Sequence, residues 1–284
     1  MNKLLSRSIA LVLAVSGTAY ASTSANSVPS CYEANKMSVA PPATKKELFV
    51  LVDQTTPLDA KLQALVRENV GRLVQPGNAF TIAKFSSFGQ GQYLEVLSSG
   101  TLEEGLSEDD RNSTGAKVLR NFDKCLKSQL DYGRRIAGAA LNEALSGSST
   151  DFAKSDVMGS VKEMSARVRE SQANEKVLFL VSDMLENSGV SSFYASKNVK
   201  TLDVNAELKK AEAAKMFGDH GGARVYVLGA GLVQATTKDG AKDSGVYRLP
   251  AAMARLQEFW QQYFEQSNAK LEHFGAPALL VPVK

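Results

Sequence analysis

The sequence predicts an α/β fold with a doubly wound, mostly parallel sheet flanked by helices, and three observations support this. Apolar runs rich in Val, Leu and Phe recur at residues 48–52, 176–181 and 224–228, and the last two each begin with one basic residue. Such runs are typical of strands buried on both faces, as in a parallel sheet covered by helices. Segments with helical spacing separate them. Two further strand-like runs, at 79–85 and 93–97, enclose a glycine-rich link and allow one antiparallel edge strand.

A secretory signal peptide is predicted over residues 1–21. Lys3 and Arg7 supply its positive start, an apolar segment follows, and the sequence AYA at 19–21 is a small-x-small cleavage pattern. We expect cleavage after Ala21 and a periplasmic or secreted protein, with an uncleaved anchor as the alternative. No later stretch reaches the roughly 20 apolar residues of a bilayer-spanning helix, so we expect no integral membrane span after signal removal.

The charge pattern argues against a nucleic acid as partner. Removal of the signal peptide lowers the formal charge from +3 to +1, because that segment carries Lys3 and Arg7 and no acidic residue. The chain also lacks a basic stripe with interleaved aromatic residues.

The two cysteines are expected to form a disulfide. Residues 22–46 read as an extended N-terminal arm, and residues 47–284 as one α/β domain. Cys31 lies in the arm and Cys125 in a predicted helix, and an oxidising compartment favours their pairing. The bridge would stabilise the fold by roughly 4 kcal/mol in the chain-entropy model. Two buried free thiols are the alternative.

The helices follow from apolar residues at helical spacing. Thr55 or Thr56 could cap the first helix, where Pro57 suits the first position, and Ser155 resembles an N-cap. The second helix allows a break near Gly133 or Gly138. The predicted helices span residues 58–74, 114–145, 155–169, 206–217 and 250–264.

An acidic stretch at residues 103–110 has two interpretations. It could form a calcium loop, but its spacing does not match an EF-hand pattern. We therefore expect a solvated surface loop.

Two acidic residues stand at the ends of predicted strands. Asp53 ends the first apolar run, and Asp183 follows the run at 176–181 after one serine. Parallel strands share a carboxyl-terminal edge, so both carboxylates are expected at the same rim, where ligands of open α/β sheets bind. Hydroxyl-bearing residues come with them: Thr55, Thr56, Thr150 and Ser155. Oxygen ligands of this kind suit a hard cation such as Mg²⁺, Mn²⁺ or Ca²⁺.

This order of elements resembles the von Willebrand factor A-like fold with its metal-ion-dependent adhesion site. That family's motif is Asp-x-Ser-x-Ser after the first strand, a Thr from a second loop and an Asp from a third. Asp53 matches the first Asp, Thr55 replaces the first Ser, and Asp183 matches the third-loop Asp. Thr150 is the candidate for the second-loop Thr, with Ser155 close behind. The resemblance covers roughly residues 47–266.

The match departs from the family's motif in three places. Pro57 replaces the second Ser and offers no side-chain oxygen, so one ligand is missing unless Thr56 supplies it. Ser182 precedes Asp183, and Met184 stands where the family has Gly.

The resemblance implies a module that binds another protein at the strand carboxyl-terminal rim, with a divalent cation accepting an acidic side chain of the partner. Without the cation, the fold could still serve as a binding scaffold. The alternative from another class is a secreted, metal-assisted hydrolase in which Asp53 and Asp183 hold a metal that activates water. Enzymatic activity is the less favoured interpretation.

The same residues also have purely structural interpretations. Asp53 could cap the first helix and Asp183 could stabilise a turn. His220 and His273 are the only histidines, and neither has metal-ligand spacing to another His or Cys. We expect both to be ordinary surface or packing residues.

Overall fold

The computed structural model describes most of the chain after the predicted signal peptide. The described residues are 26–86, 94–148, 155–195, 198–233, 235–236, 242–243 and 249–284. The predicted signal peptide at 1–21 and the candidate ligand Thr150 lie outside them. Among the described helices, none combines the length and apolar character that crossing a membrane requires.

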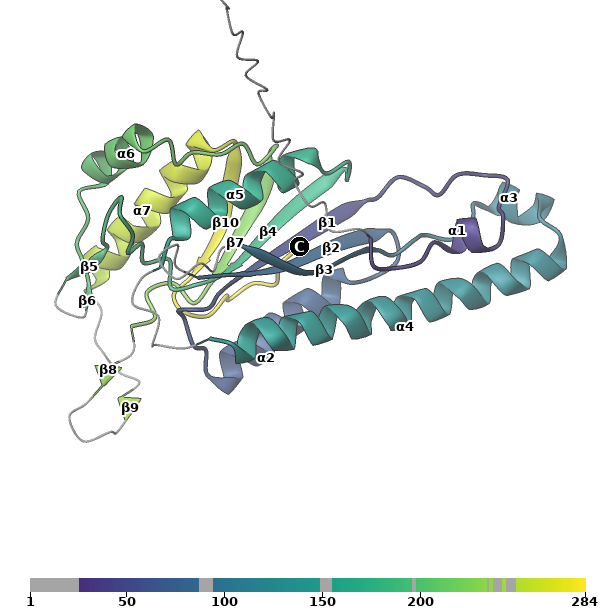
Figure 1. Cartoon of the computed structure of the whole chain (residues 1–284), viewed down its shortest axis with the longest axis horizontal. Coiled ribbons are helices and arrows are strands. Elements are labelled where there is room, and N and C mark those ends of the chain that lie inside the picture. The colour runs from purple at the N-terminus through teal and green to yellow at the C-terminus, as the bar shows by residue number, and fades with distance from the viewer. Residues whose placement is uncertain are drawn as a thin grey trace, which may run out of the picture.

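A six-stranded sheet with the order β10-β7-β4-β1-β2-β3 forms the centre of the molecule (Figure 1). All neighbouring strands are parallel except β2 and β3, which pair antiparallel at one edge. The predicted doubly wound, mostly parallel sheet with one antiparallel edge strand is confirmed. Its strands are β1 (Lys46–Asp53), β2 (Asn78–Phe85), β3 (Glu95–Thr101), β4 (Glu175–Val181), β7 (Ala223–Leu228) and β10 (Ala269–Gly275).

Helices cover both faces of this sheet and explain the continuous apolar runs. In β1, Phe49 and Leu51 belong to one core, whereas Val50 and Val52 belong to the other. The first core is closed by α5 (Val157–Glu170), α6 (Val204–Ala213) and α7 (Pro250–Gln266). The second is closed by α2 (Ala60–Leu73) and α4 (Ala116–Ser146). Since both faces are buried, the central strands carry no alternating polar residues.

The remaining described elements are short. Two of them, α1 (Cys31–Ala34) and α3 (Glu108–Ser113), lie at the end of α4 that extends beyond the sheet (Figure 1). The others are two-residue strands that pair as β5 (Tyr194–Ala195) with β6 (Asn198–Val199) and β8 (Ala235–Thr236) with β9 (Lys242–Asp243).

The long helix α4 is continuous and does not break near Gly133 or Gly138. A Cβ atom at Gly133 would lie only 2.4 Å from Cδ2 of Leu102. The glycine therefore allows α4 to approach the segment after β3 closely, and packing outweighs the roughly 1 kcal/mol by which glycine disfavours a helix.

The helix caps differ from those expected. Asp59, not Thr55 or Thr56, caps α2 by accepting a hydrogen bond from the Leu62 N–H at 2.8 Å. Asp156, not Ser155, caps α5. Local sequence offers several adjacent capping residues, and the path of the preceding chain decides which of them reaches the helix.

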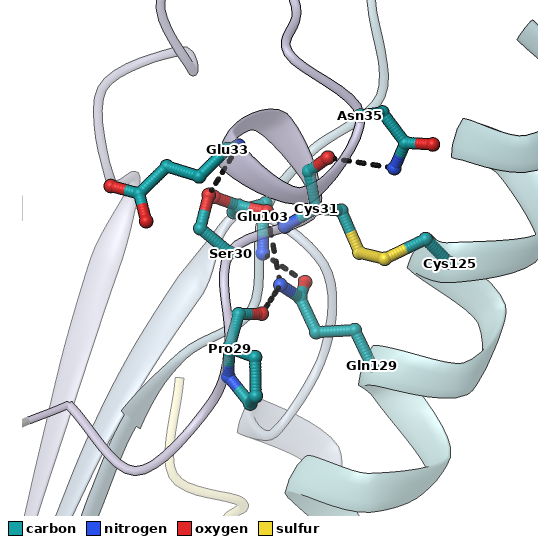
Figure 2. The surroundings of a disulfide bond; sticks show 8 residues. All are labelled: Pro29, Ser30, Cys31, Glu33, Asn35, Glu103, Cys125 and Gln129. Carbon is teal, nitrogen blue, oxygen red and sulfur yellow. Dashed lines mark hydrogen bonds between the residues drawn. A yellow bond between two sulfur atoms is a disulfide. The ribbon is translucent and has the colours of Figure 1, made fainter. Parts of the chain in front are cut away.

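The disulfide between Cys31 and Cys125 is confirmed, and it joins α1 to the projecting part of α4 (Figure 2). The bond closes a loop with a sequence separation of 94 residues. Tyr32 and Phe122 pack edge to face beside it, with ring centroids 4.8 Å apart. The arm is thus not wholly extended, because α1 forms part of this small apolar cluster.

The acidic stretch at 103–110 is more structured than a solvated loop. Glu103 accepts hydrogen bonds from the Cys31 N–H at 2.6 Å and the Ser30 hydroxyl at 2.5 Å. Its backbone N–H donates to Gln129 of α4 at 2.8 Å (Figure 2). The last part of the stretch begins α3. Glu103 therefore anchors the arm, a role that charge patterning alone did not indicate.

Candidate interaction rim

Two neighbouring strands deliver the first residues of the candidate site. β1 ends at Asp53, and its parallel neighbour β4 ends at Val181, the register partner of Val52. Ser182 and Asp183 therefore emerge beside Asp53 at the carboxyl-terminal edge of the sheet. All three are buried, with exposed fractions of 0%, 1% and 3%. We call the rim the set of Asp53, Thr55, Thr56, Ser155, Ser182 and Asp183.

Asp53 is the centre of a hydrogen-bond network that joins three chain segments. Its Oδ1 accepts from the Thr55 N–H at 2.8 Å and the Thr55 hydroxyl at 2.6 Å. Its Oδ2 accepts from the Ser182 hydroxyl at 2.7 Å and the Ser155 hydroxyl at 3.2 Å. These donors come from the loop after β1, the segment before α5 and the loop after β4. A carboxylate has about four lone-pair positions, so the chain's own donors occupy them.

Burial raises the pKa of the Asp53 carboxyl above its ordinary value, and the hydrogen bonds from Thr55, Ser182 and Ser155 oppose that rise. Thr55 is only half-buried, whereas Asp53 is fully enclosed. The carboxylate therefore lies beneath the hydroxyl groups that it orients. Each of these hydroxyls donates its hydrogen to Asp53, and the Ser182 oxygen also accepts the Met184 N–H at 2.9 Å. A hydroxyl that donates its hydrogen still has oxygen lone pairs with which it can accept.

Asp183 is held by a turn and by a more distant tyrosine. Its Oδ1 accepts the Leu185 N–H, and its Oδ2 accepts the Tyr194 hydroxyl, both at 2.8 Å. Its own N–H donates to the Thr56 hydroxyl at 3.2 Å, which links the two strand-end loops. Burial and the Asp183 charge raise the pKa of the Tyr194 phenol, so that this hydroxyl remains a donor.

Met184 has a φ of +59°, in the left-handed region that favours glycine. Met184 thus has the backbone conformation that a glycine adopts easily, and it stands at the position where the motif that the sequence resembles has Gly. Its side chain is fully buried, and its carbonyl accepts the Trp260 indole N–H at 2.8 Å. Packing against α7 therefore holds the residue in this conformation.

The structure brings together Asp53, Thr55, Thr56, Ser155 and Asp183 from the predicted set, while Thr150 lies outside the described residues. Sequence reasoning assigned no role to Ser182 or Tyr194. Ser182 had a detectable signal, since it follows the apolar run directly. Tyr194 had none, because it reaches Asp183 from a segment without clear periodicity.

The donor set of the rim is made of oxygen atoms, which fits a hard divalent cation. Pro57 contributes no side-chain oxygen, and the Thr56 hydroxyl already accepts the Asp183 N–H. Over the part of the chain that the structure describes, three or more His, Cys, Asp or Glu side chains do not gather into a metal-binding group. A cation here would depend on hydroxyl oxygens together with Asp183.

The histidines lie apart from this network. His220 is fully buried, and its ring nitrogens lie 3.1 Å from the Ser267 carbonyl and 3.2 Å from the Val161 carbonyl. Burial lowers its pKa. The His273 ring lies against Tyr226, with centroids 5.7 Å apart. Both histidines therefore take part in packing.

Comparison with known proteins identifies no family. No family model matches the chain, and no curated protein matches it. Among solved structures, similar chains include an aerotolerance-related membrane protein from Bacteroides fragilis, with 12% identity, a TM-score of 0.36, and coverage of 81% of this chain and 90% of that chain. The PilB minor pilin of Streptococcus sanguinis has 11% identity, a TM-score of 0.40, and coverage of 84% and 58%. The pilus adhesin SpaC of Lactobacillus rhamnosus GG has 15% identity, a TM-score of 0.37, and coverage of 78% and 27%. The chain thus spans less than two thirds of the last two proteins, and similarities at this level carry no argument about function.

Proposed function

We propose that this chain is an exported, von Willebrand factor A-like module that binds another protein at the rim with the help of a divalent cation. The observation that supports the proposal most is the convergence of three hydroxyl groups, from three chain segments, on the buried Asp53 carboxylate. A capping or turn role would need only backbone partners close in sequence. Export is supported by the predicted signal peptide and by the disulfide.

The proposed cation would be held by the hydroxyl oxygens of Thr55 and Ser155 and by Asp183. Asp53 would orient the hydroxyls from below, since outer carboxylates fix the geometry of directly bound ligands. When bound, Mg²⁺, Mn²⁺ or Ca²⁺ would offer an open coordination position to an acidic side chain of the partner. Thr55 is central because it is the half-exposed residue that contacts Asp53.

Affinity capture with a matched hydroxyl deletion tests this function. Immobilised mature protein would be exposed to an extract of the producing cells, with Mg²⁺ and Mn²⁺ or with a chelator, and retained proteins identified by mass spectrometry. Thr55→Val removes the hydroxyl and keeps the side-chain shape. Thr201→Val makes the same change at an exposed position before α6 and serves as the control.

We expect one dominant partner that is retained by the wild type and by Thr201→Val in the presence of cation. Chelator and Thr55→Val should each abolish its retention. Retention that is indifferent to both treatments would contradict the proposed role of the rim.

A further inference from the structure

The part of α4 that projects beyond the sheet presents a row of basic side chains to solvent (Figure 1). The row, which we call the basic face, consists of four exposed residues at intervals of three, four and three: Lys117, Arg120, Lys124 and Lys127. Residues at this spacing share one side of a helix. Cys125 and Gln129 point the other way, toward α1 and the arm (Figure 2).

The charges of the basic face have no acidic partner in the part of the chain that the structure describes. The ion pairs found there all join other residues. Asp123 lies on the same stretch of α4 but pairs with Arg111 of α3. The exposed surface of α2 differs, because Arg72 there pairs with Glu68 one turn away. The basic face is therefore available to an external anionic group.

Helix stability does not explain the row. Successive members of the basic face are like-charge neighbours on the helix, and such neighbours repel. The first turn of α4 has no acidic residue, and its N-cap Gly115 makes no side-chain hydrogen bond, so the helix dipole also opposes the positive charges. The disulfide, the aromatic pair beside it and the Glu103 hydrogen bonds hold this part of α4 in place. Tertiary contacts thus fix a repulsive row of charges on a projecting helix.

The chemistry of the basic face suits a flat anionic surface better than a shaped partner. Protein interfaces are built around buried aromatic and apolar anchors, and lysine is depleted from them. Single-stranded nucleic acids stack on exposed aromatic rings, whereas Phe122 in this stretch is fully buried. An anionic lipid surface needs neither feature, because it attracts every basic residue near it and these attractions add up.

We propose that the basic face binds the surface of a membrane that contains anionic lipids. The exposed side of α4 would lie against the headgroups, and its ammonium and guanidinium groups would contact lipid phosphates. The other end of α4 reaches the loop after β1, where the Gln54 amide donates to the Ala144 carbonyl at 2.6 Å. About 30 Å of helix separate Ala144 from Lys124. The proposal therefore does not rest on the function proposed for the rim.

Vesicle co-sedimentation of the mature protein tests the proposal, with chelator present so that a cation at the rim cannot contribute. Vesicles of phosphatidylglycerol and phosphatidylcholine in equal parts are compared with vesicles of phosphatidylcholine alone and with immobilised poly-L-glutamate. We expect binding to the anionic vesicles that weakens as salt rises, because ions screen surface charges, and no binding to the neutral vesicles. No binding to the anionic vesicles, equal binding to the neutral ones, or retention by poly-L-glutamate alone would overturn the proposal.

A fourfold charge-removing variant assigns the binding to this face. It carries Lys117→Gln, Arg120→Gln, Lys124→Gln and Lys127→Gln, and it should bind the anionic vesicles about tenfold more weakly or less. The matched control removes three lysines and one arginine from exposed positions on α2, α5 and α6, through Lys61→Gln, Lys162→Gln, Arg169→Gln and Lys209→Gln. Both variants lose the same net charge, and the control should bind like the wild type. An equal loss in both would show that overall charge is responsible and would overturn the proposal.

Lysine footprinting of the wild type locates the contact without any variant. The anionic vesicles should protect Lys117, Lys124 and Lys127 from an amine-reactive reagent, as measured by mass spectrometry. Lys61 and Lys162 should react equally with and without vesicles. Equal protection of both sets, or protection of the second set alone, would refute the assignment.

Discussion

Replacing Asp53 tests whether its carboxylate organises the rim. Asp53→Ala removes the acceptor of four hydrogen bonds, from Thr55 twice and from Ser155 and Ser182 once each. Thr55 is half-exposed and can bond to water, whereas the two serines are buried. At about 1 to 3 kcal/mol for each buried group left unsatisfied, and with part of this offset by loss of the buried charge, we expect a cost of about 3 kcal/mol.

Asp53→Asn should cost much less. The amide keeps one oxygen acceptor, and the serine hydroxyls can rotate to accept from its NH₂ group. The raised pKa of Asp53 also indicates that the folded protein favours a neutral group at this position. We expect a cost of about 1 kcal/mol, in the range of a single net hydrogen bond.

Urea unfolding followed by circular dichroism measures both variants against the wild type. The slope of the unfolding free energy against urea should stay constant, so that shifts of the midpoint report stability. If Asn costs as much as Ala, or if Ala costs less than about 1 kcal/mol, Asp53 does not hold the three segments together and the reasoning fails.

Three further predictions concern the disulfide, the tyrosine and a buried glutamate. The double variant Cys31→Ala, Cys125→Ala should lower the free energy of unfolding by up to about 4.7 kcal/mol, the chain-entropy value for a separation of 94 residues. Reduction of the disulfide in the wild type without denaturant should lower the free energy of unfolding by the same amount. A loss below about 1 kcal/mol in urea would show that the arm does not unfold with the domain. Tyr194→Phe should cost about 1 to 2 kcal/mol, since Asp183 loses a buried hydrogen bond, and an unchanged urea midpoint would contradict this contact. Burial raises the pKa of Glu186 to about 8, with the negative charge of Asp156 adding to the rise. Between about pH 4.5 and pH 8, Glu186 therefore keeps its proton in the folded protein, whereas the unfolded chain has released it. The free energy of unfolding falls as pH rises through this range. Glu186→Gln should flatten this dependence and raise the melting temperature at the upper end, and an equal slope in both proteins would refute the assignment.

Much of the architecture could be predicted because burial on both faces leaves a direct trace in the sequence. The apolar runs at 48–52 and 176–181 match β1 and β4 closely, and each ends where a polar residue enters the rim. Asp53 and Asp183 could be paired in advance because parallel neighbours share one edge. The joint position of these residues follows from strand topology alone.

The rest depends on tertiary contacts that local patterns do not encode. Ser155 is predicted both as a helix cap and as a site residue, and only its position in the site holds: Asp156 caps α5, while the Ser155 hydroxyl bonds to Asp53, 102 residues away in sequence. Gly133 reads as a helix breaker, yet it allows close packing against Leu102. Tyr194 could not be predicted as a partner of Asp183, because it lies in an irregular segment whose sequence has no helical or strand periodicity.

Thermal-shift titration of the chelator-treated mature protein with Mg²⁺, Mn²⁺ and Ca²⁺ tests the cation-dependent rim most directly, with Thr55→Val and Thr201→Val measured alongside. Binding to the folded state alone raises the melting temperature by mass action. The account predicts a saturable rise with at least one cation in the wild type and in Thr201→Val, and none in Thr55→Val. No rise with any cation, or an equal rise in Thr55→Val, would contradict it.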